Sequence, residues 1–118
     1  MKNSMPALAA AAVLGAACTA SRALPANYAP TEAQISAAQA VGAEHEPRGA
    51  LHLKMARDGV VQAQELTRRG KEREAALMLD RARTDAELAL MIAREATARN
   101  EATEAERELR NLSRGPQP

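Results

Sequence analysis

Cys18 is the residue whose chemistry and position together indicate a specific modification. It is the only cysteine of the 118-residue chain, and it follows four small or apolar residues: Leu14, Gly15, Ala16 and Ala17. This arrangement resembles a lipobox, in which small side chains let a peptidase reach the backbone and the thiol takes up a diacylglyceryl group. The match departs from the usual pattern at Gly15, where Leu is usual. We predict cleavage before Cys18 and lipidation of its sulfur. The alternative is an ordinary signal cut after Ala20, which would discard the cysteine.

The residues before Cys18 have the composition of an export signal. Lys2 supplies one positive charge, and residues 5–17 carry no charge. A short basic start, a brief apolar run and small residues before the cut are typical of a secretory signal peptide, here residues 1–17. The run is too short for a transmembrane helix, which needs about 20 apolar residues. Thr19 follows the cysteine, whereas by the usual sorting rule an Asp at this position would favour retention in the inner membrane. We therefore expect a lipid-anchored protein on the periplasmic side of the bacterial outer membrane.

The histidines are the next residues that could do chemistry. His45 and His52 lie seven residues apart, and Glu44 and Glu46 flank the first of them, so a metal site is conceivable. Pro47 falls between the histidines, and neither a His-x3-His spacing nor a cysteine pair supports metal binding. No Gly-rich phosphate loop is present, and acylation would block the Cys18 thiol as a nucleophile. The sequence predicts no catalytic residue, no metal and no cofactor.

Composition sets the kind of domain that could carry these residues. Without residues 1–17 the chain has fifteen basic and fifteen acidic residues, and Tyr28 is its only aromatic residue. A neutral chain with one aromatic residue is a poor nucleic-acid binder. Its apolar content is mostly Ala, which buries little area per residue. The abundance of Ala, Glu, Arg and Leu favours long helices packed on one another over a large core.

The first part of the mature chain is predicted to be a tether followed by a short helix. Residues 18–30 contain two prolines and show no periodicity, which is typical of a flexible linker. Thr31 with Gln34 three places later has the pattern of a capping box. We therefore expect a helical domain over residues 31–112, with a first helix from about residue 32 to 41 that Gly42 ends.

The remaining proline and glycine residues predict a helical hairpin. Pro47 suits the first position of a helix that would run to about Arg69. Asp58-Gly59 also favours a turn. The apolar residues before and after this pair nevertheless keep one helical spacing, so we predict a continuous helix. Gly70 is the expected break, because Arg68 and Arg69 precede it and acidic residues follow it. A helix of residues 71–112 would come next, with a disordered tail over residues 113–118.

The two long helices are expected to pack through small residues at heptad spacing. This predicted packing seam consists of Leu53, Ala56, Val60, Ala63, Leu79, Ala82, Ala86, Ala89 and Ala93. Larger apolar residues would widen the face around the seam on the third helix: Leu77, Leu88, Leu90, Met91 and Ile92. The second helix can cover only the first half of the third, and Leu109 and Leu112 are the large apolar residues beyond Ala98. The predicted fold is thus all-α: a short helix plus an antiparallel helical hairpin with a long, protruding C-terminal helix.

Several short segments resemble a known family. They are Pro30-Thr31-Glu32, Gly42-Ala43-Glu44-His45 with Pro47, Lys54-Met55-Ala56-Arg57, Gly70 with Glu74-Ala75, and the helix from Ala82 to Ala93. Together they make residues 30–105 similar to the family called domain of unknown function 4398. The resemblance implies a small bacterial envelope protein, often a lipoprotein, from a family with no established catalytic residues.

Three functions are compatible with these features. The favoured hypothesis is a non-catalytic envelope lipoprotein, a structural scaffold or protein-interaction module that presents its long helix to an envelope protein of unknown identity. The second is a self-associating coiled-coil lipoprotein, a homo-oligomer formed through the third helix. The third is a periplasmic ligand carrier or enzyme, which would need a concave polar site that narrow helices with small side chains struggle to form.

Overall fold

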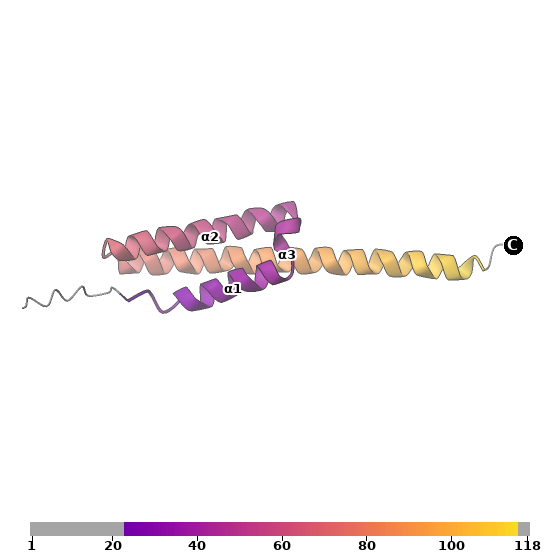
Figure 1. Ribbon diagram of the computed structural model, residues 1–118, viewed down its shortest axis with the longest axis horizontal. Helices are drawn as coiled ribbons and strands as arrows, with labels where there is room; N and C mark the ends of the chain where they lie inside the picture. Colours follow the sequence, from indigo (N-terminus) through magenta and orange to yellow (C-terminus); the bar gives the residue numbers. More distant parts are fainter. Residues whose placement is uncertain (1–22, 116–118) are drawn as a thin grey trace, which may run out of the picture.

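The computed structural model describes residues 23–115, and every regular element in that range is helical (Figure 1). The elements are α1 (Tyr28–Ala40), a short 3-10 turn η1 (Ala43–His45), α2 (Pro47–Arg68) and α3 (Glu72–Ser113). The predicted all-α fold with a long, protruding C-terminal helix is confirmed. The predicted signal peptide, the lipobox and Cys18 lie outside the described residues.

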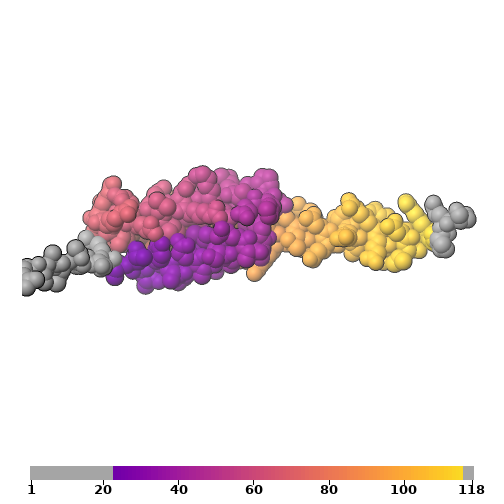
Figure 2. Space-filling view, viewed as in Figure 1, coloured from indigo at the N-terminus to yellow at the C-terminus, as the bar shows by residue number. Residues whose placement is uncertain are grey.

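α3 is the axis of the fold. α2 runs antiparallel to it and forms the hairpin, while α1 packs along another side of α3 and runs in the same direction as α3 (Figure 1). With 42 residues, α3 is about 63 Å long at 1.5 Å per residue. α1 and α2 cover only its first half. These three packed parts form the body of the molecule, and the C-terminal half of α3 projects alone from it (Figure 2).

The start of α1 differs from the prediction. The helix begins at Tyr28, so residues 28–30, which were expected in the tether, belong to the fold. Thr31 is buried inside the helix, where its hydroxyl donates to the Asn27 carbonyl at 2.7 Å and lies 3.3 Å from the Leu79 carbonyl. The predicted capping box with Thr31 as N-cap is therefore wrong. The physical reason is tertiary contact: Thr31 packs against α3, which overrides the local capping pattern.

Asn27 fixes the beginning of α1 to α3. Its side-chain amide donates to the Ala76 carbonyl at 2.9 Å and to the Asp80 carboxylate at 2.8 Å. The Gln64 amide of α2 donates to the Tyr28 hydroxyl at 2.6 Å. These polar contacts join the start of α1 to both other helices.

α2 is continuous through Asp58-Gly59, as predicted. Gly59 is buried against α3, and a Cβ atom at this position would lie 2.9 Å from the Cβ of Ala82. The glycine therefore permits the close approach of the two helices. Gly70 in the hairpin turn has a φ of 78°, a left-handed conformation that favours glycine. The predicted break between the two long helices at Gly70 is therefore confirmed.

The core is a strip of small side chains between the helices. All nine residues of the predicted packing seam are buried, and α1 adds Ile35 and Ala38. Leu90 and Ile92 are also buried, but Leu77, Leu88 and Met91 are exposed. The expectation that these three widen the packed face is wrong, because they line open grooves beside α1 and α2 and are not covered by either helix.

Candidate interaction surfaces

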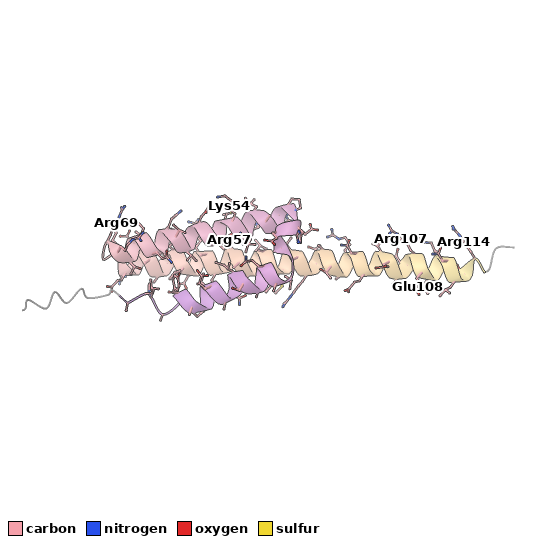
Figure 3. The ribbon with its side chains drawn as sticks, viewed as in Figure 1. Lys54, Arg57, Arg69, Arg107, Glu108 and Arg114 are labelled. Atoms are coloured by element: carbon pink, nitrogen blue, oxygen red, sulfur yellow. The ribbon has the colours of Figure 1, made fainter. Side chains whose placement is uncertain are left out.

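The free half of α3, residues 97–113, is exposed at every position. Leu109 and Leu112 are 67% and 71% exposed, respectively. Arg107 and Glu108 project to opposite sides of this segment, and Arg114 extends from its end (Figure 3). All the buried residues of α3 end at Ala93. The fold of the body therefore does not explain the apolar residues of the free half.

These apolar residues form a stripe at heptad spacing. In the free half, Ala98, Ala102, Ala105, Leu109 and Leu112 alternate four and three residues apart. The same spacing reaches back to Met91 and Leu88, with the charged Glu95 interrupting the apolar run. We call these seven apolar residues the outer stripe. At about 100° per residue, the stripe lies on roughly the opposite side of α3 from the buried seam. The sequence already contained this spacing, but the prediction singled out only the two leucines.

A shallow groove runs along α1 and α3 beside the start of the outer stripe. Its walls are Gln34 of α1 and four residues of α3: Thr84, Glu87, Leu88 and Met91. A second shallow groove lies between α2 and α3 near the hairpin turn, lined by Val61, Gln62, Glu65, Leu66, Glu74, Leu77, Met78 and Arg81. Both grooves are mainly apolar and open to solvent, with Glu87 beside the first and Glu65, Glu74 and Arg81 beside the second. A small-molecule site usually encloses most of its ligand, so these open surfaces suit contact with another helix better.

The two histidines are not brought together. His52 on α2 places its Nδ1 atom 3.0 Å from the Asp85 Oδ1 atom on α3, and both side chains are partly buried. His45 is exposed in η1. Residues 23–115 contain no group of three or more side chains placed to hold a metal ion. The His52–Asp85 contact is therefore best read as a link between the two hairpin helices.

Glu65 is the centre of a small ion-pair cluster at the end of α2. Its carboxylate accepts from Arg68 at 2.6 Å and from Arg69 at 2.8 Å. Hydrogen bonds from Arg68 and then Arg69 hold the pKa of Glu65 below its ordinary value. This cluster neutralises part of the basic run that precedes Gly70.

No family model, curated protein or solved structure that was compared with the chain matches it. The similarity of residues 30–105 to the domain of unknown function 4398 family therefore stays a prediction. Within the described part of the chain, no helix has a stretch long and apolar enough to cross a bilayer.

Proposed function

We propose that the protein is a non-catalytic helical interaction module of the bacterial envelope, which binds a further protein chain through the free half of α3. The observation that carries this proposal is the exposure of Leu109 and Leu112 on a helix that continues far beyond its own fold. Lipid on Cys18 would hold the module to the outer membrane on the periplasmic side, as the sequence predicts.

Energetics supports an interaction at this segment. Isolated helices of this length are marginal in water, so the free half depends on propagation from the packed half of α3. Burying one leucine side chain is worth about 1.5–3 kcal/mol, and the free half presents two of them one turn apart. A partner that covers the outer stripe would gain this energy and also order the helix.

The other surfaces give less support to a catalytic or ligand-carrying role. In residues 23–115 the grooves are shallow and the histidines lie apart, whereas a ligand site is usually concave with a few converging polar groups. Self-association through the packing seam of α3 is also disfavoured, because α1 and α2 bury that seam within one chain. Self-association would have to use the outer stripe.

Truncation after Ala98 tests the proposal. Every buried residue precedes this position, so the truncated chain should keep the body and its helical circular-dichroism signal. We expect it to lose the proteins that co-purify with the full chain from membranes. Leu112→Glu should have the same effect, while Leu51→Glu, at a site 55% exposed on α2 and outside both grooves, is the matched control. Unchanged co-purification after truncation would contradict the proposal.

A further inference from the structure

We propose that the partner of the outer stripe is the outer stripe of a second copy, packed antiparallel, with the twofold axis beside Asn100. This inference rests on the proposed function, since it names the occupant of the same surface. It concerns an unpartnered helix face whose large side chains are exposed, and it follows from the order of side-chain sizes and charges along that face.

The sizes along the stripe are complementary only when one helix is reversed. With the axis at Asn100, Leu88 lies opposite Leu112 of the second copy, and Met91 lies opposite Leu109. Ala98 lies opposite Ala102 near the axis. Large residues thus meet at both ends of the contact, while small ones meet at the centre and let the backbones approach closely. The contact spans residues 88–112, about 36 Å at 1.5 Å per residue.

The charges that flank the stripe favour the same direction. In an antiparallel coiled coil the flanking positions face their equivalents. This arrangement places Arg99 opposite Glu106 of the second copy and Arg94 opposite Glu108, and the twofold axis repeats each pair. Glu101 faces Glu101 of the second copy once and Arg99 faces Arg99 once, on either side of the axis, against two copies of each opposite-charge pair. The balance is attractive.

A parallel pair would place like charges together. Arg94 would face Arg99 of the second copy, and Glu101 would face Glu106. Glu95, which interrupts the outer stripe, would lie opposite Glu95 of the second copy, whereas the antiparallel register places it opposite Ala105. Like charges at flanking positions destabilise the wrong pairing.

The shape of the body leaves room for the antiparallel pair. The free half is long enough for Leu109 and Leu112 of the second copy to reach the groove that Gln34, Leu88 and Met91 line. In each copy the body covers α3 only to about Ala96. The two bodies therefore lie beyond opposite ends of the central segment and do not overlap.

The direction of the pair can be tested by reversing one charge. Sedimentation equilibrium would be measured on the chain from Thr19, which keeps every residue of the buried core, at micromolar concentration. We expect a dimer, and we expect Glu106→Arg to raise its dissociation constant about tenfold because the introduced arginine would face Arg99. Adding Arg99→Glu should restore the dimer. A parallel pair predicts the opposite for Glu106→Arg, because the new Arg would face Glu101.

A spin label at Arg114→Cys, in the same chain without Cys18, gives an independent distance. The antiparallel register predicts backbones about 42 Å apart at this position, and a parallel pair predicts neighbouring labels. Leu112→Glu should give monomer with unchanged helicity, while Leu51→Glu should remain dimeric. A wild-type chain that is only monomeric, a Glu106→Arg chain that dimerises more tightly, or a short label distance would overturn the inference. If the chain is monomeric yet still captures a different protein that truncation after Ala98 releases, only this inference fails and the proposed function stands.

Discussion

Gly59 of α2 lies so close to Ala82 of α3 that an added Cβ atom would stand 2.9 Å from the Ala82 Cβ. Real Cβ atoms do not approach one another this closely, so the helix spacing at this point depends on the missing side chain. Because most residues of the core are alanines, close backbone approach has to supply the dispersion contacts that larger side chains supply elsewhere.

Gly59→Ala should therefore destabilise the protein. Alanine favours a helix interior over glycine by about 1 kcal/mol, but overpacking a tight contact typically costs about 1–3 kcal/mol. We expect a net loss of stability in urea or thermal denaturation followed by circular dichroism. Ala82→Gly in the same chain should recover part of that loss by removing the opposing methyl group. A single Gly59→Ala variant more stable than the parent would contradict the close contact.

The ion-pair cluster at Glu65 should respond to pH in a defined direction. Because Arg68 and Arg69 lower the pKa of Glu65 in the fold, its stabilising contribution is fully present above the ordinary carboxyl pKa of 4.5 and is lost as pH falls through the lowered value. An NMR titration of the Glu65 carboxyl group should show a midpoint below 4.5. Arg68→Gln with Arg69→Gln should raise that midpoint, while Arg57→Gln should leave it in place. A midpoint that ignores both arginines would contradict the geometry.

Local signals in the sequence were sufficient for most of the fold. Pro47 and Gly70 marked the limits of α2 to within about a residue, and the heptad spacing of small residues identified the face that packs. These features depend on backbone conformation and periodicity, which a single sequence displays directly. The continuous helix through Gly59 followed from the unbroken apolar phase on either side.

Contacts between distant residues could not be read in this way. Thr31 has the pattern of an N-cap, but its burial against Leu79 of α3 places it inside the helix. Asp85 contacts His52 of α2, a pairing that no spacing within a single helix indicates. Both outcomes depend on the register between helices, which no local pattern specifies. The outer stripe was visible as spacing, but its exposure became clear only once α1 and α2 were placed.

The predicted anchor at Cys18 can be tested separately from the fold. Metabolic labelling with a clickable fatty acid should label the wild-type chain in cells and should be lost in Cys18→Ala. Because the residue precedes the described helices, this change should leave the helical body intact. Labelling that survives the substitution would remove the lipid anchor from the proposed function.

The central claim is that the outer stripe on the free half of α3 is the interaction surface of the protein. Its most direct test is a photo-activated cross-linking residue placed at Leu112 in the full chain in cells, with Leu51, an exposed leucine of α2 that lies outside both grooves, as the control position. We expect illumination to yield, from Leu112 and not from Leu51, an adduct of two copies of the chain. An adduct with a different protein would keep the surface and replace its partner. No adduct from Leu112, or equal adducts from both positions, would contradict the claim.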